Sequence, residues 1–460
     1  MGENREKLGS RLGFILLSAA CAIGIGNVWR FPYVAGRSGG GLFVLVYLVC
    51  LVVLGLPVLL MEFAAGRAAR RSIAALHGVL APGKPAWRLH GAVGSLGLVT
   101  LMMFYTVVTA WMVLYFAKTA SGALDGLAVE EVKGVFGGLL ADFRTQALVV
   151  AGVCAVSAGV CAIGLQKGLE RVTKWMMLAL LALIVVLAAN SLLLDGASEG
   201  LRFYLVPDFA RMEASGIGFG TVLANALQQA FFTLSLGIGS MAIFGSYIGR
   251  TRALLGEGIN VVVLDTFVAL CAGLIVLPAC SAFHVGYEEG PSLIFVTLPN
   301  VFNRMAGGRF WGALFFLFMS FAALTTVLAV FEGIVAALRD CTRWGRGKAC
   351  AVLGAAMPVL SLPCILGFNV WKGFHPLGGD SNVLDLEDFL VSDLALPLGA
   401  LFFALFCCHR FGWGWKGFCA EVNAGSGPKF PEGLRFYCAY LLPVAIVLVM
   451  GIGLYRRFFA

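Results

Sequence analysis

Residues Ala19 to Tyr33 place groups that avoid lipid inside a long apolar segment. The stretch reads Ala-Ala-Cys-Ala-Ile-Gly-Ile-Gly-Asn-Val-Trp-Arg-Phe-Pro-Tyr, so two glycines, an asparagine and an arginine fall at the depth of a membrane core. Glycine costs a helix about 1 kcal/mol relative to alanine. Irregular backbone at that depth is tolerated only inside protein or beside water. We therefore expect a broken membrane helix whose freed amides and carbonyls bind something; a flexible kink is the alternative.

The composition is that of an integral membrane protein. Of 460 residues, 60% are hydrophobic and 13% are charged, whereas about 25% of an ordinary soluble domain is charged. Apolar runs of about 20 residues indicate a helical bundle rather than a barrel. The 13 cysteines are scattered and the five histidines lack ligand spacing, which favours core packing over metal or disulfide. The net charge of +8 lies in short loops, so it does not indicate nucleic-acid binding.

The apolar runs predict an all-α protein with eleven membrane helices. A shorter apolar piece at 291–302 ends in prolines and predicts a loop helix. Lys and Arg favour the loops on the N-terminal side by about two to one, which predicts a cytoplasmic N-terminus in a multi-pass protein of the cell (inner) membrane. The predicted spans are 11–36, 41–67, 89–119, 145–164, 171–194, 217–247, 255–283, 309–338, 349–369, 385–408 and 434–455.

A second interruption falls five spans after the first. Phe231 to Ser240 combine Gly237 and Gly239 with hydroxyl side chains in mid-membrane. Because five is odd, the second half of the chain would enter the membrane from the opposite side. This predicts a single transporter domain, 1–460, with inverted repeats at 11–194 and 217–408, broken helices one and six, an additional helix at 434–455, and a site between the repeats.

Five motifs resemble the neurotransmitter:sodium symporter family, and in particular its prokaryotic members with eleven spans and the LeuT fold. They are Gly24–Tyr33, Gly39–Gly41, Glu62–Arg67, Phe231–Gly237 and Ala322–Thr326. The resemblance covers nearly the whole chain. It implies sodium-coupled symport of a small substrate by alternating access.

The resemblance implies two sodium sites, built from the oxygen ligands that hard cations prefer. The first would use the Ala22 carbonyl, Asn27, Thr233, Asp265 and the substrate carboxylate. The second would use the carbonyls of Ala20, Ile23 and Ala322 with the hydroxyls of Thr325 and Thr326. Without the resemblance, two adjacent threonines on a helix are more simply explained by hydrogen bonds to the preceding turn.

The resemblance also implies an amino-acid substrate, because Gly24 stands where monoamine carriers have an aspartate. The substrate carboxylate would meet the Ile25 and Gly26 amides and the Tyr105 hydroxyl. The ammonium would meet the carbonyls of Ala22, Phe232 and Thr233 and the Ser235 hydroxyl. The side-chain pocket would be uncharged, so the substrate side chain should be neutral and hydrophobic, either aliphatic or aromatic. The pocket residues would be Leu101, Tyr105, Phe232, Ile238, Thr326 and Val330, of which Leu101, Ile238 and Val330 also suit simple core packing.

Charged pairs at the two mouths are the expected gates. Arg30 and Asp388 would close the outer side over a lid of Tyr105 and Phe232, and Arg5 and Asp340 would close the cytoplasmic side. The alternative for such a pair is a static surface contact, worth about 0–1 kcal/mol.

Two intramembrane acids and two departures from the family pattern add to these expectations. Glu62 is expected to hold broken helix six, whereas Glu332 receives no role. Leu178 replaces a proline that would help span five unwind. Asp265 replaces a common asparagine and adds a fixed negative charge, so chloride should not be required, although the family's chloride-holding groups are matched by Tyr47, Gln229 and Thr233.

Two other classes of membrane protein remain as alternatives: a channel, and a receptor that binds an amino acid without moving it. A channel needs a continuous polar lining, whereas the polar groups here cluster at two breaks. No nucleophile–base set or cofactor motif indicates an enzyme. The expected partners are an amino acid, sodium and the lipid bilayer, with no nucleic acid. The preferred amino acid and the oligomeric state stay open.

Overall fold

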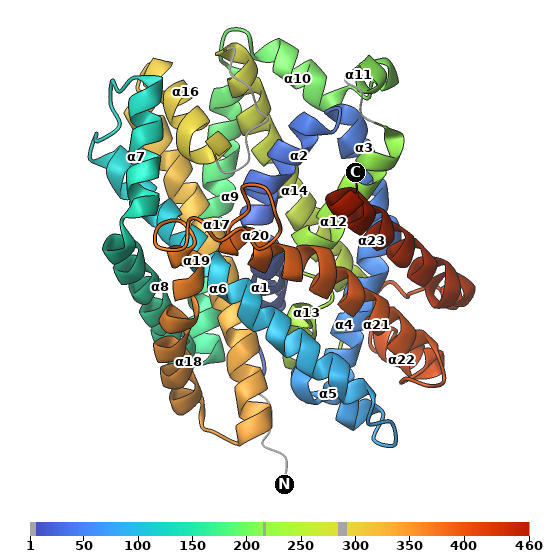
Figure 1. Ribbon diagram of the computed structural model, residues 1–460. Helices are drawn as coiled ribbons and strands as arrows, with labels where there is room; N and C mark the ends of the chain where they lie inside the picture. Colours follow the sequence, from blue (N-terminus) through green and yellow to red (C-terminus); the bar gives the residue numbers. More distant parts are fainter. Residues whose placement is uncertain (1–5, 215–217, 284–291, 460) are drawn as a thin grey trace.

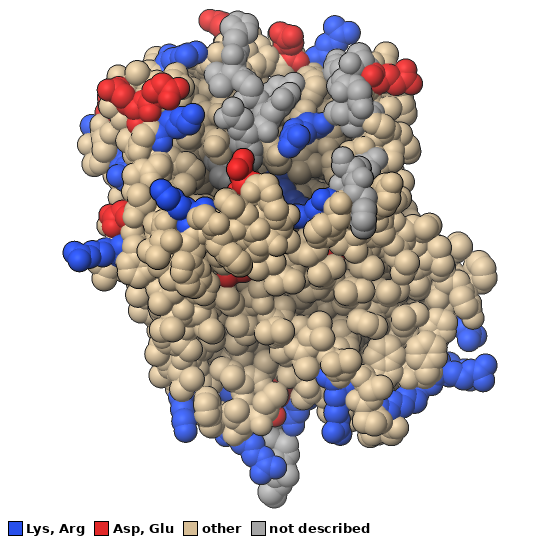
Figure 2. Space-filling model, in the orientation of Figure 1, with Lys and Arg blue, Asp and Glu red and all other residues tan. Residues whose placement is uncertain are grey.

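The computed structural model describes residues 6–214, 218–283 and 292–459, and in these ranges the chain is helical (Figure 1). The described residues contain no strand beyond an isolated bridge between Arg252 and Ser426. The predicted all-α class is therefore confirmed. Charged side chains gather at the two ends of the molecule and leave a largely uncharged belt between them (Figure 2).

Nine helical segments of the described chain are long and apolar enough to cross a membrane. They are Gly41–Ala69 (α3, Gly41–Cys50, and α4, Leu56–Ala69), Trp87–Ala120 (α6), Phe143–Ile163 (α8), Leu165–Leu192 (η3, Leu165–Glu170, and α9, Arg171–Leu192), Leu254–Ala282 (α14), Gly308–Thr342 (α17), Arg346–Leu366 (α18, Arg346–Leu360, and α19, Leu362–Leu366), Val383–Cys408 (α20, Val383–Asp388, η5, Phe389–Ala395, and α21, Leu396–Cys408) and Glu432–Tyr455 (η6, Glu432–Leu434, η7, Tyr437–Leu441, and most of α23, Leu442–Phe459).

Two broken spans complete the predicted set of eleven. The first joins Arg11–Ala22 (α1) to Gly26–Arg37 (η1 and α2) across a bend of 56°. The second joins Phe219–Thr233 (α12) to Ser240–Tyr247 (α13), and each half alone is too short to cross. Every predicted span falls on one of these segments, so the broken helices one and six of the sequence analysis are both present.

Short helices at the two ends of the bundle were absent from the sequence analysis, with one exception. The predicted loop helix at 291–302 corresponds, over its described residues, to η4 (Leu293–Thr297) and α16 (Leu298–Arg304). The others are too short or too polar to register as apolar runs. They are α5 (Ile73–Leu80), α7 (Val129–Ala141), α10 (Ala197–Leu205), α11 (Phe209–Ala214) and α22 (Trp415–Val422), of which α5 and α22 lie toward the N-terminal end of the bundle and α7, α10 and α11 at the other (Figure 1).

The break in span six is held by an acid from α4. Ser235, Gly237 and Gly239 have φ angles of +50°, +103° and +76°, a left-handed backbone that cannot continue a helix. Glu62 accepts a hydrogen bond from the Gly237 N–H at 2.5 Å and another from the Ala242 N–H at 3.3 Å. The carboxylate thus replaces part of the backbone bonding that the break removes.

A buried ion pair fixes the N-terminal end of the bundle. Arg67 in α4 donates to Glu421 in α22 at 2.7 Å and to the Arg252 carbonyl at 2.8 Å. Arg250 reaches the same carboxylate from the loop after α13, at 2.6 Å. The Arg67 side chain is 0% exposed, whereas the Arg250 side chain is 61% exposed. The two arginines share a partner but differ in burial.

Replacing Arg67 with methionine is expected to destabilise the protein by about 3 kcal/mol, because it leaves the buried carboxylate of Glu421 without that partner. Arg250→Met is the matched control and should cost less than about 1 kcal/mol, because the solvated pair is weak. The measurement is the fraction of detergent-solubilised protein that stays monodisperse after graded heating. Equal losses in the two variants would contradict the assignment of Arg67 as the structural partner.

Candidate functional site

The break in span one leaves two backbone carbonyls without their helical donors. In a regular helix the Gly24 N–H would donate to Ala20, and the Asn27 N–H to Ile23. Here the Gly24 N–H donates to Asn27 Oδ1 at 3.2 Å, and the Asn27 N–H donates to the Gly24 carbonyl at 3.1 Å. Thr326 Oγ1 lies 3.1 Å from each freed carbonyl oxygen. The break therefore aims both oxygens at one point.

Three carbonyls converge on the hydroxyl of Thr326. The third is that of Ala322, at 3.2 Å, one turn earlier in α17. One hydroxyl proton serves one acceptor at a time, so the set has more lone pairs than donors, as a hard cation requires. Thr325 differs: its hydroxyl donates to the Phe321 and Ala322 carbonyls at 2.9 and 3.0 Å, the hydrogen bond to the preceding turn that was the alternative explanation. All residues expected at the second sodium site are nevertheless adjacent.

The side chains expected at the first sodium site form a second buried cluster. Asn27 Nδ2 donates to Asp265 Oδ1 at 2.7 Å, and the Thr233 hydroxyl donates to Asp265 Oδ2 at 3.0 Å. The three residues come from η1, α12 and α14, and each is fully buried. Ala22 lines the neighbouring pocket. Within the described chain, Asp265 forms no ion pair with a basic side chain, so its charge is left for a cation.

A small pocket of about 20 Å³ lies between the two clusters, at the place expected for the substrate. Tyr105 accepts a hydrogen bond from the Ile25 N–H at 2.7 Å, which joins two of the groups expected to hold the substrate carboxylate. The Ser235 hydroxyl donates to the Cys21 carbonyl at 3.1 Å. The pocket residues are Cys21, Ala22, Gly24, Gly26, Leu101, Tyr105, Phe232, Ser235, Thr326 and Leu396, none of them charged.

Four residues expected at the substrate site do not line the pocket, and two that were not expected do. Of the four, Ile25 lines the larger cavity described below and Thr233 belongs to the cluster around Asp265. Ile238 and Val330 are buried but are not among the lining residues; Ile238 instead packs against Gly97, where a Cβ atom would lie 2.7 Å from it. Cys21 and Leu396 line the pocket although the sequence analysis did not select them. Cys21 directly precedes Ala22, an expected site residue, and this position could have indicated it. No pattern in the sequence pointed to Leu396, which comes from a distant span.

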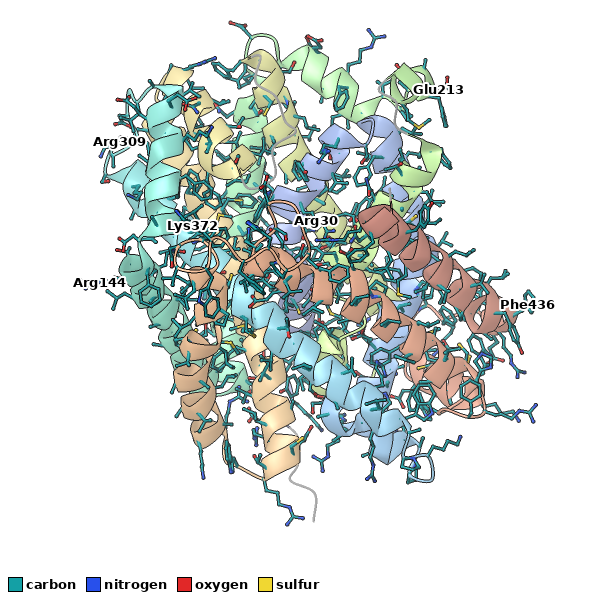
Figure 3. The ribbon with its side chains drawn as sticks, viewed as in Figure 1. Arg30, Arg144, Glu213, Arg309, Lys372 and Phe436 are labelled. Carbon is teal, nitrogen blue, oxygen red and sulfur yellow. The ribbon has the colours of Figure 1, made fainter. Side chains whose placement is uncertain are left out.

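A cavity of about 630 Å³ lies on the side of the pocket away from the N-terminus. Tyr105 and Phe232 line both spaces, so they form the partition between them, as expected of a lid. Figure 2 shows a hollow in this upper half of the molecule, with basic side chains at its wall. Arg30, labelled in Figure 3, lies in the central part of the same half, and its guanidinium sits 4.6 Å from the centre of the Phe232 ring.

The expected outer gate pair is apart. Arg30 and Asp388 both line the large cavity, but no ion pair joins these two described residues. Asp388 instead accepts a hydrogen bond from the Ser392 hydroxyl at 2.5 Å, and Arg30 Nη1 is buried without a hydrogen-bond partner in the described chain. The structure therefore has this mouth open.

The opposite mouth is closed by polar contacts. Arg5, half of the expected gate there, lies outside the described residues. Asp340 accepts hydrogen bonds from the backbone N–H and hydroxyl of Ser72, both at 2.7 Å, and lies 3.6 Å from Arg71. These contacts tie the end of α17 to the loop between α4 and α5.

Glu332, which the sequence left without a role, belongs to this closed side. Arg346 binds it at 2.5 Å, and the Tyr247 hydroxyl donates to it at 2.5 Å. Arg346 also binds Glu6, 3.2 Å away, which Arg339 approaches at 3.3 Å. Burial acts to raise the pKa of Glu6, but Arg346, the Leu165 N–H and Arg339 together outweigh it and hold that pKa below its usual value.

Known proteins share this architecture along the whole chain. A family model described as the sodium:neurotransmitter symporter family matches residues 5–128 and 140–455. The sodium-dependent transporter YhdH of Bacillus subtilis is 35% identical over 443 residues, 96% of each chain. A sodium-dependent transporter of Haemophilus influenzae is 31% identical over 88% of this chain and 89% of its own.

A solved structure agrees with these relatives. The crystal structure of MhsT in complex with L-phenylalanine has a TM-score of 0.87 and 34% sequence identity, and the match covers 99% of this chain and 100% of MhsT. MhsT has the LeuT fold, so the predicted fold is confirmed. The protein is a multi-pass membrane transporter and not an enzyme. The chain belongs to the sodium:neurotransmitter symporter family.

Proposed function

We propose that the protein takes up neutral, hydrophobic amino acids together with sodium by alternating access. The observation that carries this proposal is the break in span one. Its amides, its freed carbonyls and an uncharged pocket all meet at one place in the centre of the membrane region. A zwitterion and cations are the ligands that such a set of groups can neutralise without a charged side chain in the pocket.

The substrate class follows from the charges around the pocket. Tyr105 already accepts the Ile25 N–H, so its hydroxyl proton is available to a substrate carboxylate. Because no charged residue lines the pocket, a charged substrate side chain would be buried unpaired at high cost. About 20 Å³ holds no amino acid, so the Phe232 ring, which separates this pocket from the large cavity, must move when the substrate enters. L-Phenylalanine bound to MhsT supports an amino acid, including an aromatic one.

Two sodium ions fit the two clusters. One would lie between Ala22, Asn27, Thr233 and Asp265 and be completed by the substrate carboxylate. The other would lie among the carbonyl oxygens of Ala20, Ile23 and Ala322 and the hydroxyl oxygens of Thr325 and Thr326, with the Thr326 proton turned away from the ion. The substrate thus helps to build the first ion site, which couples ion and substrate binding. The second ion would hold α1 against α17, since its ligands come from both.

The open and closed mouths support an outward-open orientation with the N-terminus in the cytoplasm of the cell. Closing the outer mouth would bring Arg30 to Asp388, and opening the inner one would separate Asp340 and Glu332 from their partners. The two inverted repeats, 11–194 and 217–408, would rock about the site, with 434–455 outside them. The Arg71–Asp340 pair suits this role, because Arg71 is 34% exposed and a solvated pair contributes about 1 kcal/mol or less, whereas the buried Arg346–Glu332 pair separates only at a greater cost.

Uptake into proteoliposomes tests the proposal. A sodium gradient directed inward should drive accumulation of a labelled hydrophobic amino acid, and competition by the twenty amino acids should rank the preferred one. Uptake that ignores the sodium gradient would favour a channel, and binding without uptake would favour a receptor. Either result would overturn coupled symport.

Gly24→Ala is expected to abolish substrate binding. A Cβ at Gly24 would lie 2.1 Å from the Tyr105 hydroxyl oxygen and 2.6 Å from Thr326 Oγ1, so one methyl group disturbs both a carboxylate donor and the second ion site. Gly24→Asp should also abolish substrate binding, both through the same steric clash and because its negative charge would repel the substrate carboxylate. Gly333→Ala is the matched control, because its Cβ would meet the nearest atom, on Leu98, at an ordinary 3.6 Å. Normal substrate affinity in Gly24→Ala would show that Gly24 does not border the site.

Thr326→Val and Asn27→Ala are each expected to weaken apparent sodium affinity at least roughly tenfold, because each removes an oxygen from a site with few ligands. Valine keeps the shape of threonine, so packing around position 326 should survive. Thr100→Val in α6 serves as control, since its hydroxyl only bonds the Leu96 carbonyl at 3.1 Å. Sodium titration of substrate binding gives the readout. Unchanged sodium affinity in both site variants would refute the proposed ion sites.

Replacing chloride with gluconate should leave wild-type uptake unchanged, because Asp265 already supplies a negative charge beside the first sodium. The buried Tyr47 hydroxyl lacks a hydrogen-bond partner in the described chain, so one donor that could hold an anion remains, whereas the Gln229 amide N–H group already donates to the Gly26 carbonyl. Asp265→Asn should therefore lose uptake or become chloride-dependent. A wild type that stops without chloride would overturn the charge-substitute role of Asp265.

A further inference from the structure

The described N-terminal segment before α1 lies along η3, the irregular turn that begins span five. Four hydrogen bonds join the two segments, and all lie at the N-terminal end of the bundle. They run from the Leu165 N–H to Glu6 (3.1 Å), from the Gln166 side chain to the Lys7 carbonyl (2.8 Å), and to Glu170 from the Gly9 N–H and the Ser10 hydroxyl (both 2.8 Å). Span five therefore anchors the start of α1 through hydrogen bonds to the residues immediately before that helix.

Glu170 is the buried member of this contact, with 8% of its surface exposed. The Ser10 hydroxyl accepts the Gly13 N–H at 2.9 Å, as an N-cap does, while it donates to Glu170 Oε1. The carboxylate thus lies at the positive end of the α1 dipole and accepts the N–H of Gly9, the residue before the N-cap. Within the described residues no Lys or Arg forms an ion pair with Glu170, so the end of α1 supplies the balancing partial charge.

Gly13 makes room for this carboxylate. A Cβ at Gly13 would lie 1.9 Å from Glu170 Oε1 and 2.4 Å from Glu170 Cδ, whereas real Cβ atoms essentially never approach another heavy atom that closely. Any larger residue at position 13 must push the carboxylate out of its place. The contact can therefore be broken from either helix, by a change at Glu170 or by a change at Gly13.

The structure on the two sides of this contact shows what it restrains. α1 is separated from α2 by the break at Ile23–Ile25, so α1 can change its tilt without moving α2. α9 continues as a regular helix through Leu178, and the irregular backbone of span five is confined to η3 and Gly164, whose φ is +116°. Glu170 is the last residue of η3 and so joins the movable half of span one to the irregular start of span five.

We propose that Glu170 is a positioning residue for transport: it latches the N-terminal half of span one to span five, and its release permits α1 to swing and open the site toward the cytoplasm. This inference rests on the alternating access proposed above. Arg11, which binds Glu257 at 2.9 Å, is a second tether, but its side chain is 47% exposed, so the buried Glu170 contact is the stronger one.

Hydrogen exchange of the α1 amides tests the latch without requiring transport. Glu170→Gln removes a charge-assisted acceptor, so the amides of residues 9–13 are expected to exchange roughly tenfold faster. Gly13→Ala should do the same although alanine by itself stabilises a helix and would slow exchange. The double variant should exchange no faster than either single one, because both break one contact. Glu199→Gln, at an exposed acid in the first turn of α10, is the matched control and should change nothing.

Labelling of Cys21 separates a gating role from a merely structural cap. Cys21 lines the pocket near the other end of α1, and an impermeant thiol reagent applied from the N-terminal side should modify it faster in Glu170→Gln than in wild type, as read by mass spectrometry. Ser10→Ala gives an independent variant with a milder change. Unaltered exchange and unaltered Cys21 labelling in Glu170→Gln, or slower exchange in Gly13→Ala, would overturn the latch. Failure of sodium-driven uptake in wild type would instead refute the transport proposal.

Discussion

Every feature of the site depends on how the backbone is satisfied at the two helix breaks. A broken helix in lipid leaves amides and carbonyls that water cannot reach, so other groups of the protein must take their place. Asn27 does this for the Gly24 amide, and Glu62 does it for the amides of Gly237 and Ala242. Both side chains accept hydrogen bonds from backbone N–H groups, and the carbonyl oxygens freed by the break in span one are left without their helical donors. The proposed second sodium site uses two of these surplus acceptors, the carbonyls of Ala20 and Ile23.

The buried Arg67–Glu421 pair differs in burial from the charges at the outer mouth and from the Arg71–Asp340 pair, and this difference corresponds to their proposed roles as scaffold and gate. Arg67 and Glu421 are buried and hold α4 to α22, so separating them would leave charges without water. Arg30, Asp388 and the Arg71–Asp340 pair border cavities or the surface, where partners can be exchanged at little cost. A transporter needs both, because the rocking parts must stay rigid while the contacts between them break.

The sequence predicted most of this architecture because the strongest signals are local. Apolar length predicted eleven spans, and glycine and asparagine at membrane depth predicted the break that brings Asn27 to Asp265. It missed contacts that depend on which faces of distant helices meet. Leu396 enters the pocket from span ten whereas Val330 is buried without lining it, and Glu332 binds Arg346 across the α17–α18 turn. The helical pattern of apolar residues predicts which face of a helix is buried, but it does not predict which other helix packs against that face.

The length of α1 connects these observations. Its 12 residues span about 18 Å as one rigid rod. At one end the Ala20 carbonyl meets Thr326 of α17, and at the other Ser10 meets Glu170 of span five. A rod held at both ends cannot tilt, whereas a rod held at one end can pivot there. In the proposed cycle, sodium strengthens the first attachment and Glu170 provides the second. Loss of the ion frees one end, and release of the carboxylate then frees the other, so ion release and helix movement are coupled mechanically through a helix that touches both.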